Sequence, residues 1–592
     1  MERMIAMRDG VQLFTAIYIP KDISPANTYP FLMERTPYGC APYGVAAFPR
    51  NGLGPNSKLL HEKYIFVYQD VRGRYKSQGN FEEMTPHIAN KKSSKDVDES
   101  SDAYDTVDWL LKNVSGNNGN VGLYGVSYPG FYATASLPNA HPAIKAVSPQ
   151  APVTDEFIGD DANHNGAFFL LDNFSFMNSF GGKRTADSTN YIPVFKKDRI
   201  KDVYEYFLQM GGLKNTNSTS FYNNDVKIWN EYLAHDTYDD YWKARNIRPH
   251  LKSIKPAVLV VGGWFDAEDM FGALHTYEAI EQQSKANNNH LLMGPWTHGA
   301  WGRADWSRFG SFEFGANVNT YFEKTETDFF NFYLKGKGSI DLKEATMFNT
   351  GTNEWKQLNK WPPANTTAVP LFLGANGKMA KGMPMDAGTD VYTSDPGKPV
   401  PYISGISSRR QNEYLVDDQH FAAQRPDVLA YQTDILTEDI TVAGRIRADL
   451  FVSLQSPAGI ENLHPDADFI VKVIDVLPDT MPSLRGITMA GFQRMIRAEV
   501  FRGKFRKSFE KPEAFVPGKT EEVAFDLNDM LHTFKKGHRI MVQVQSSWFP
   551  IIDRNPQQFM KIPNAEPGDF KPLEIRLHHK ETRIILPVAT NL

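Results

Sequence analysis

A serine between a strand-like and a helix-like segment is the feature that most constrains this chain. Val121–Tyr124 is a short apolar run, and the hexapeptide G-V-S-Y-P-G at residues 125–130 follows it directly. A helical segment then runs from about Gly130 to Leu137, where Pro138 ends it. Small residues at a strand-to-helix turn let the chain bend sharply and expose the serine hydroxyl. Ser127 is therefore our candidate nucleophile.

The hexapeptide departs from the usual nucleophile turn at one position. Pro129 stands two residues after the serine, where a glycine is usual, and Gly130 follows it. The alternative interpretation is a plain strand–turn–helix connection that carries no chemistry. Other candidate nucleophiles are weaker. Ser77 lies in polar sequence with no helix after it, and a lone thiol such as that of Cys40 is usually inert.

The first part of the chain alternates strand-like and helix-like segments. Apolar runs at 64–68 and 121–124 predict buried strands, and a helical pattern with Asp and Ser at its start begins near residue 98. Sheet character returns at 255–261 and at 290–293. This alternation indicates a mostly parallel, doubly wound α/β sheet.

Two other stretches depart from this pattern, as expected for 592 residues, too many for one core. Aromatic and polar residues with helical periodicity predict an inserted, largely helical cap. From about residue 345 onward, short strands are separated by turn residues, and the segment at 361–367 is predicted to be a linker. The alternation at 539–545 suits an antiparallel sandwich with one buried face. The predicted divisions are an α/β core at 1–150 and 251–344, a helical cap at 151–250 and a β-sandwich at 345–592.

Two later strand ends offer the partners that an activated serine needs. A serine nucleophile requires a base, and the base requires an orienting acid. One apolar strand runs into G-G-W-F-D, which ends at Asp266, and the next runs into G-P-W-T-H, which ends at His298. Both residues follow Ser127 in the order Ser, Asp, His that is typical of α/β hydrolases. We predict that His298 accepts the serine proton and that Asp266 orients the imidazole. The backbone N–H of Tyr128 is the first expected donor to the oxyanion.

Composition argues against several kinds of partner. The formal net charge is −5 and no basic block offsets it, so no nucleic-acid partner is expected. No run of 18 or more apolar residues occurs, so no membrane span is predicted. A single cysteine and the absence of metal-ligand spacings lead us to expect no disulfide, no metal and no other cofactor. The first ten residues lack a signal-peptide pattern, which leaves the location open: periplasmic or secreted if such a peptide was removed, otherwise cytoplasmic.

With these residues placed, the chain resembles the X-Pro dipeptidyl-peptidase and cocaine-esterase type of serine hydrolase. Within that group it is most similar to the α-amino acid ester hydrolases, which are also acyltransferases. The resemblance covers nearly the whole chain and rests on these motifs: R-T-P-Y-G at 35–39, Q-D-V-R-G-R at 69–74, G-V-S-Y-P-G at 125–130, F-D-A-E-D-M at 265–270 and G-P-W-T-H-G at 294–299. It implies an α/β-hydrolase core, an inserted helical cap and a C-terminal jelly roll, and it suggests a homo-oligomer.

The resemblance also assigns two sets of residues. In such enzymes a tyrosine hydroxyl after an early strand is the second oxyanion donor, and the matching residue is Tyr38. Three carboxylates that hold the substrate's α-ammonium group match Asp161, Glu268 and Asp269. Clustered anions suit a desolvated ammonium, which needs several acceptors. Helix capping is the alternative role for each of these carboxylates. A shift of one residue would replace Asp161 by its neighbour Asp160.

The resulting hypothesis is acyl transfer from an α-amino acid ester or related amide through an acyl-Ser127 intermediate. The acceptor would be water or an amine, such as an amino acid or a β-lactam nucleus. The first alternative is an X-Pro dipeptidyl-peptidase of the same fold. A glutaryl-type acylase is the second, although carboxylates around the site would repel an anionic acyl group. A non-catalytic protein that binds carbohydrate or a partner is disfavoured by the ordered Ser, Asp and His.

Overall fold

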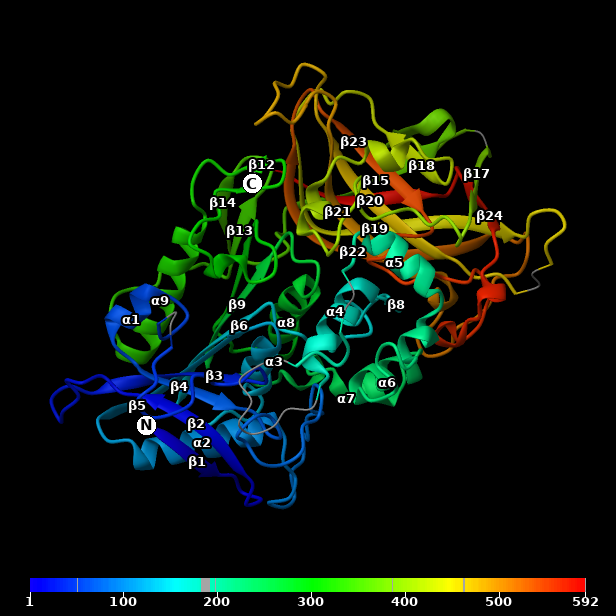
Figure 1. Cartoon of the computed structure of the whole chain (residues 1–592). Coiled ribbons are helices and arrows are strands. Elements are labelled where there is room, and N and C mark those ends of the chain that lie inside the picture. Colours follow the sequence, from blue (N-terminus) through cyan, green and yellow to red (C-terminus); the bar gives the residue numbers. More distant parts are fainter. Residues whose placement is uncertain (50–51, 183–191, 197–198, 386, 462–463, 591) are drawn as a thin grey trace.

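Two large sheets dominate the computed structural model, with helices packed on and between them (Figure 1). Each sheet belongs to one part of the sequence, and the change from one to the other follows residue 358. The structure describes residues 1–49, 52–182, 192–196, 199–385, 387–461, 464–590 and 592.

The first sheet has ten strands and is parallel at its centre. The strand order is β1-β2-β4-β3-β5-β6-β9-β10-β13-β14, with parallel pairing from β4 through β13 and antiparallel pairs at both edges. This arrangement confirms the predicted α/β-hydrolase-like sheet. The strands are β1 Glu2–Ala6, β2 Gln12–Tyr18, β3 Tyr29–Thr36, β4 Ile65–Asp70, β5 Asn117–Val126, β6 Ile144–Gln150, β9 Ala257–Gly263, β10 Asn289–Gly294, β13 Ala345–Asn349 and β14 Glu354–Leu358.

Helices cover both faces of this sheet, with α1 and α9 on one side and α3 and α8 on the other (Figure 1). Close packing explains the glycine at position 122, since a Cβ there would lie 2.7 Å from Leu334 of α9. Asp98 caps α2 by accepting a hydrogen bond from Ser101 N–H, as the Asp and Ser residues at its start predict. Within the described residues, no helix is both long and apolar enough to cross a membrane. The helices are α1 Ser57–Glu62, α2 Glu99–Asn113, α3 Tyr128–Ala135, α8 Met270–Gln283 and α9 Asn319–Lys335.

A mainly helical insertion separates β6 from β9. Its aromatic residues form a core around Phe174, whose ring centroid lies 5.2 Å from that of Phe207 and 5.3 Å from that of Tyr222. In Figure 1 the helices α4 and α5 lie against the C-terminal β domain, and Leu170 N–H donates to Ile551 O at 2.8 Å. The insertion contains β7 Asn163–His164, β8 Ala167–Phe168, α4 Leu170–Phe180, α5 Val203–Met210, α6 Lys227–Ala234 and α7 Asp240–Arg245.

The second sheet contains eleven strands and forms a C-terminal β domain. Its longest strand, β19, pairs antiparallel with β22, β24 and β25. A β-rich C-terminal domain is thus confirmed, whereas its jelly-roll connectivity stays a prediction. The strands are β15 Thr366–Gly374, β16 Lys378–Ala380, β17 Thr389–Ser394, β18 Val428–Gln432, β19 Ile440–Gln455, β20 Asp468–Val476, β21 Gln493–Arg502, β22 Glu521–Phe534, β23 Arg539–Gln545, β24 Leu573–His578 and β25 Arg583–Ala589.

The predicted division at residue 345 does not coincide with the change from the first sheet to the second. Residues 345–358 form β13 and β14, which extend the first sheet, because β13 pairs in parallel with β10. Their short, turn-bounded pattern resembles that of the later strands, and only the pairing partner distinguishes them. The first strand of the β domain begins at Thr366, inside the segment predicted to be a linker at 361–367.

The prediction of one buried face for residues 539–545 is also wrong. Gln543 and Gln545, on the face expected to be polar and exposed, are fully buried. The segment between β17 and β18 covers this face, and Gln543 Nε2 donates to Gln419 O at 3.2 Å. Alternating polarity therefore reflects a covered face: the Nε2 groups of Gln543 and Gln545 donate to backbone carbonyls, whereas their Oε1 atoms are buried without a hydrogen-bond partner.

Candidate active site

Ser127 lies at the turn between β5 and α3, where the backbone is bent out of the ordinary helical and extended regions. Its φ of 67° and ψ of −126° are rare for a residue with a side chain and cost roughly 1–3 kcal/mol. Surrounding hydrogen bonds hold the turn: Ser127 N–H donates to Gln150 O at 2.9 Å, and Phe131 N–H donates to Ser127 O at 3.0 Å. The backbone thus has the sharp geometry expected of a nucleophile turn.

Close backbone contacts explain the glycines of the hexapeptide and the proline between them. A Cβ at Gly125 would lie 2.2 Å from Pro129 O, and one at Gly130 would lie 2.6 Å from Gln150 O. Pro129 is in the first turn of α3, where a backbone N–H has no acceptor within the helix. The glycine that the turn requires is therefore Gly130, and the proline costs no hydrogen bond.

Asp266 and His298 lie beside each other because β9 and β10 are parallel neighbours. Asp266 follows the end of β9, His298 follows the end of β10, and their side chains meet with His298 Nδ1 2.9 Å from Asp266 Oδ2 and 3.1 Å from Oδ1. Asp266 Oδ1 also accepts from the backbone N–H groups of Glu268 at 2.9 Å and Asp269 at 3.1 Å. The carboxylate is thus fixed on both sides.

The other imidazole nitrogen, His298 Nε2, faces a carboxylate. Glu268 Oε2 lies 3.8 Å away from it. Among the described residues, no hydrogen bond joins His298 Nε2 to Ser127 Oγ. Catalytic hydrogen bonds are often long without substrate and shorten when it binds. The geometry places an anion next to the nitrogen that would receive the serine proton.

Ser127 opens onto a cavity of about 340 Å³ between the first sheet and the helical insertion. One wall is apolar and includes Phe176, Met177 and Phe180 of α4. The rest of the lining is unusually acidic, with five carboxyl-bearing residues. They are Glu83, Glu156, Asp161, Asp172 and Glu268.

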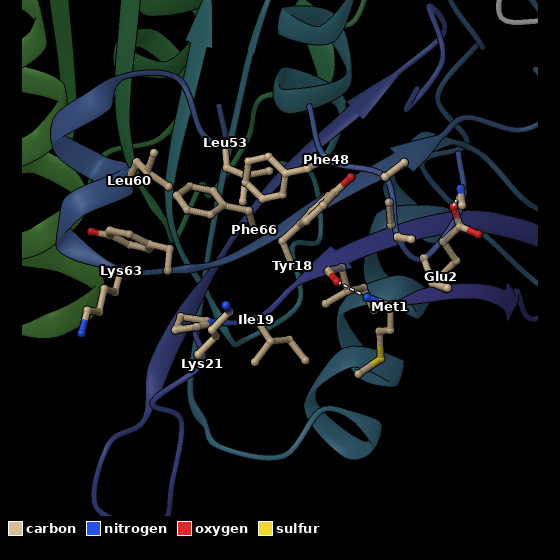
Figure 2. Close-up of a pocket in the computed structure, with 18 of the residues that line it drawn as sticks. Met1, Glu2, Tyr18, Ile19, Lys21, Phe48, Leu53, Leu60, Lys63 and Phe66 are labelled. Carbon is tan, nitrogen blue, oxygen red and sulfur yellow. Dashed lines mark hydrogen bonds between the residues drawn. The ribbon is translucent and has the colours of Figure 1, made fainter. Parts of the chain in front are cut away.

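A larger cavity of about 710 Å³ lies elsewhere, at the edge of the first sheet (Figure 2). Figure 2 shows Tyr18, Phe48 and Phe66 grouped in this largely apolar hollow, with Lys21 and Lys63 near it. The serine turn does not contribute to its lining, whereas Ser127 and Tyr128 line the smaller cavity; Asp266 and His298 line neither of the two. The smaller, acidic cavity is therefore the candidate substrate-binding site.

The structure brings two of the three predicted ammonium ligands to the cavity. Asp161 and Glu268 line it, whereas Asp269 is fully buried behind them. Burial and the nearby Glu268 raise the pKa of Asp161 well above its usual range. Burial also raises the pKa of Asp269, helped by Asp161, and neither oxygen of Asp269 has a hydrogen-bond partner. Although Asp269 precedes α8, its side chain makes no capping hydrogen bond.

Asp160, the alternative to Asp161, is a structural residue. Its Oδ2 accepts hydrogen bonds from the N–H and hydroxyl of Thr154, both at 2.8 Å, and from Asp155 N–H at 2.9 Å. Its Oδ1 accepts from Gly272 N–H at 2.7 Å, which joins the insertion to α8. With its oxygens occupied and no exposure, Asp160 cannot face a ligand in this conformation.

Neighbouring carboxylates control the charge of His298, the predicted base. Burial lowers the pKa of His298, but Asp266 and Glu268 outweigh this effect and raise it to about 10. The imidazole of the substrate-free protein is therefore protonated at neutral pH. Burial raises the pKa of Glu268 itself, yet Arg410 and His298 hold it at about 2. Glu268 is thus an anion throughout the ordinary pH range.

Both predicted oxyanion-hole residues line the cavity beside the serine. The ring centroids of Tyr38 and Tyr128 are 6.3 Å apart in an edge-to-face arrangement. Tyr128 is the first residue of α3, so its backbone N–H has no acceptor within the helix. Its hydroxyl, by contrast, accepts a hydrogen bond from Met84 N–H at 3.1 Å.

Sequence reasoning missed several charged residues of the cavity. Asp172 is the single acidic residue in an aromatic helix, a signal that could have marked it. Glu83 and Glu156 belong to irregular loops, where no periodicity distinguishes them; Tyr232 of α6 donates a hydrogen bond to Glu156 at 2.6 Å. Arg410 comes from a distant part of the chain, and nothing in its local sequence indicates this position.

The single cysteine adds nothing to this chemistry. Cys40 is buried, and burial together with Asp70 raises the pKa of its thiol well above the usual range. A thiol of this kind is a poor nucleophile. Across the part of the chain that the structure describes, no group of three or more His, Cys, Asp or Glu side chains is arranged to hold a metal ion.

Comparison with known proteins agrees with this geometry. Residues 9–300 match the model of the X-Pro dipeptidyl-peptidase (S15) family, and residues 339–581 match that of the X-Pro dipeptidyl-peptidase C-terminal non-catalytic domain. The cocaine esterase of Rhodococcus sp. (strain MB1 Bresler) is 27% identical over 613 aligned positions, which cover 99% of this chain and 97% of the esterase.

Two solved structures are similar over almost their whole length. An aminopeptidase from a marine-sediment Thaumarchaeota archaeon has a TM-score of 0.90 and 34% identity, covering 100% of this chain and 96% of its own. An α-amino acid ester hydrolase also has a TM-score of 0.90 and 34% identity, covering 99% of this chain and 96% of its own. With the serine turn, the Asp–His pair and these matches together, the chain belongs to the X-Pro dipeptidyl-peptidase (S15) family and is a serine hydrolase.

Proposed function

We propose that this protein transfers the acyl group of α-amino acid esters and related amides through an acyl-Ser127 intermediate to water or an amine. The observation that carries the proposal is the anionic pocket beside the base: Asp161 and Glu268 line the same cavity as Ser127, and Glu268 Oε2 lies 3.8 Å from His298 Nε2. An α-ammonium group is one bond from the carbon next to the reacting carbonyl. A cation recognised this close to the nucleophile therefore belongs to the acyl group.

In the first half of the reaction Ser127 attacks the carbonyl carbon. His298 Nε2 takes the hydroxyl proton as the Oγ–C bond forms, and Asp266 stabilises the imidazolium. The carbonyl oxygen becomes an oxyanion, which the N–H of Tyr128 and the hydroxyl of Tyr38 would stabilise. The intermediate collapses, His298 gives the proton to the departing alcohol or amine, and the acyl-serine ester remains.

In the second half the acceptor releases the acyl group. Water or an amine loses a proton to His298 and attacks the ester carbonyl, and the proton then returns to Ser127 Oγ as its bond to carbon breaks. Transfer to an amine would exceed hydrolysis where the amine occupies the cavity before water does. A β-lactam nucleus is one such amine, and only the family resemblance supports this acceptor.

The substrate's ammonium group would supply hydrogen bonds and a positive charge to carboxylates of the cavity. Asp269 is fully buried, neither of its carboxyl oxygens has a hydrogen-bond partner, and His298 Nδ1 lies 3.8 Å from its Oδ2. Burial of a carboxyl group without hydrogen bonds is costly. A cation held between Asp161, Glu268 and Asp269 would relieve like-charge repulsion among them. The helical insertion would then act as the cap that excludes water from this interaction.

Peptide amides are a second candidate substrate. The similarity at 34% identity to a protein described as an aminopeptidase favours removal of a single N-terminal residue, since this acyl group carries the same α-ammonium. An X-Pro dipeptidyl-peptidase would place that ammonium one residue further from Ser127. A glutaryl-type acylase is disfavoured by the acidic lining, which would repel an anionic acyl group.

The proposal is tested by pairs of methyl esters that differ only in the α-amino group. We expect kcat/KM for the amino ester to exceed that of its desamino analogue, and Ser127→Ala to abolish turnover of both. An aminoacyl amide and an X-Pro amide, assayed with the same enzyme, separate single-residue from dipeptide release. Equal rates for the amino and desamino esters would refute the ammonium pocket, and unchanged turnover in Ser127→Ala would refute the mechanism.

A further inference from the structure

The C-terminal β domain contributes a charged residue to the catalytic cavity. Among the described residues that line the cavity, Arg410 alone belongs to this domain, which matches a family model described as non-catalytic. Its guanidinium forms ion pairs with Glu268 and with Asp172 of α4. The three side chains are only 18%, 20% and 21% exposed, so the pairs are largely shielded from solvent. Arg410 thus joins the β domain, the helical insertion and the first sheet at one point.

The backbone around Arg410 is fixed rather than loosely presented. Ser407 O accepts a hydrogen bond from Val203 N–H of α5 at 2.7 Å, which ties this segment to the insertion. The carbonyl of Arg409 accepts hydrogen bonds from the Ser407 and Tyr402 hydroxyls, the latter at 3.2 Å. In Figure 1 the helix α5 lies against the β domain. The guanidinium therefore enters the cavity from a defined position.

The ion pairs divide the acidic cavity into two parts. Glu268 already has a cation, whereas no ion pair within the described residues involves Asp161. A ligand cation is consequently attracted toward Asp161 and repelled from Arg410. Two like charges in a shielded cavity repel each other far more strongly than in water. A cationic group of a ligand is therefore disfavoured beside Glu268 and Asp172, where the protein already supplies the cation.

We propose that Arg410 determines the acyl specificity of this enzyme: as a built-in cation on Glu268, it favours α-amino acids with an uncharged side chain over those with a cationic one. The proposal rests on the proposed function, since it takes the acyl group to be an α-amino acid whose ammonium enters this cavity. The apolar wall of Phe176, Met177 and Phe180 offers a surface on which an uncharged side chain packs.

The test compares lysine methyl ester with norleucine methyl ester, whose side chain has a similar length and no charge. We expect the wild-type enzyme to prefer the norleucine ester. Arg410→Gln should raise the lysine-to-norleucine ratio of kcat/KM by about 10- to 100-fold, because it removes the repelling charge and frees Glu268. Arg409→Gln is the matched control, since Arg409 is the exposed neighbour and is absent from the cavity lining. A ratio in Arg410→Gln equal to that in Arg409→Gln would overturn the proposal.

Two further variants separate charge from packing. Arg410→Lys keeps the positive charge but lacks the planar fork, so it should retain the preference for norleucine. The double variant with Arg410→Gln and Asp172→Asn leaves no unpaired Asp172 carboxylate, which guards against misfolding of the single variant. We expect it to show the same shift toward lysine, and a folded double variant with the wild-type ratio would overturn the proposal. Both esters carry an α-ammonium group, so this ratio is independent of the amino-versus-desamino comparison that tests the proposed function.

Discussion

Glu268 Oε2 lies 3.8 Å from His298 Nε2, the nitrogen that would receive the serine proton. An anion at this position stabilises the protonated imidazole, whose pKa burial lowers but Asp266 and Glu268 raise to about 10. A base that is already protonated cannot activate Ser127. In the proposed mechanism, the carboxylates that would attract a substrate's ammonium group would therefore also keep His298 protonated until a cation joins them. This coupling makes the proposed substrate an activator of its own reaction.

The first prediction concerns the pH dependence of kcat. Activity requires neutral His298, so it should rise with pH toward the raised pKa of the imidazole. A bound ammonium offsets the carboxylates and lowers that pKa, so kcat for an amino ester should persist to lower pH than kcat for its desamino analogue. Profiles of kcat, which report the enzyme–substrate complex, measure this for both esters. Identical acid limbs would show that the ammonium does not act on His298.

A second prediction isolates the contribution of Glu268. Glu268→Gln should move the acid limb of the desamino ester to lower pH by about one unit, because a charge within ~4–6 Å commonly shifts a pKa by roughly 1–3 units. The same variant should reduce the advantage of the amino ester. Glu205→Gln on α5 is a suitable control, since Glu205 is exposed. An unchanged acid limb would show that Glu268 does not affect the pKa of His298.

The adjacent residues Asp160 and Asp161 should respond oppositely to amide substitution. Asp160→Asn removes an acceptor of several buried backbone hydrogen bonds and should cost about 2–4 kcal/mol of unfolding free energy. Asp161→Asn should leave stability nearly unchanged and lower kcat/KM for amino esters about 10- to 100-fold relative to desamino analogues. Denaturant unfolding and paired ester kinetics measure the two effects. The reverse pattern would exchange the roles assigned to these residues.

Asp269→Asn distinguishes a ligand-binding carboxylate from a helix cap. If the Asp269 side chain capped α8, its substitution would cost about 1 kcal/mol of unfolding free energy. Because the carboxyl of Asp269 is buried without a hydrogen-bond partner, we instead expect Asp269→Asn to be neutral or stabilising in the substrate-free protein. Selectivity for the amino ester should fall at the same time. Lower stability with unchanged selectivity would identify a structural residue.

The oxyanion hole predicts a difference between two neighbouring tyrosines. Tyr38→Phe removes a proposed donor and should lower kcat roughly 10²-fold with little change in KM. Tyr128→Phe is the control, since its proposed contribution is the backbone N–H and its hydroxyl accepts from Met84 N–H. Equal effects of the two substitutions would argue against a role of the Tyr38 hydroxyl.

The fold was largely predictable because its signals are local. The alternation of apolar strands and helices indicated the parallel sheet, and the strand ends at Asp266 and His298 indicated where catalytic side chains would gather. The predicted division at residue 345 does not coincide with the change of sheet, because a short strand has no sequence feature that identifies the sheet it will join. The pairing of β13 with β10 is a property of packing between distant segments.

The sequence by itself determined the turn at Ser127, since Gly125 and Gly130 are required by close contacts within a few residues or with the neighbouring strand. It also determined the order of the three catalytic candidates. Only the tertiary structure decided which of Asp160 and Asp161 faces the cavity, because one residue's rotation of the chain separates a buried acceptor from a lining carboxylate. It alone placed Arg410 on Glu268, since these residues are 142 positions apart and meet only when the β domain packs against the insertion. The geometry of a turn depends on neighbouring residues, whereas the net charge of a cavity depends on side chains that only folding brings together.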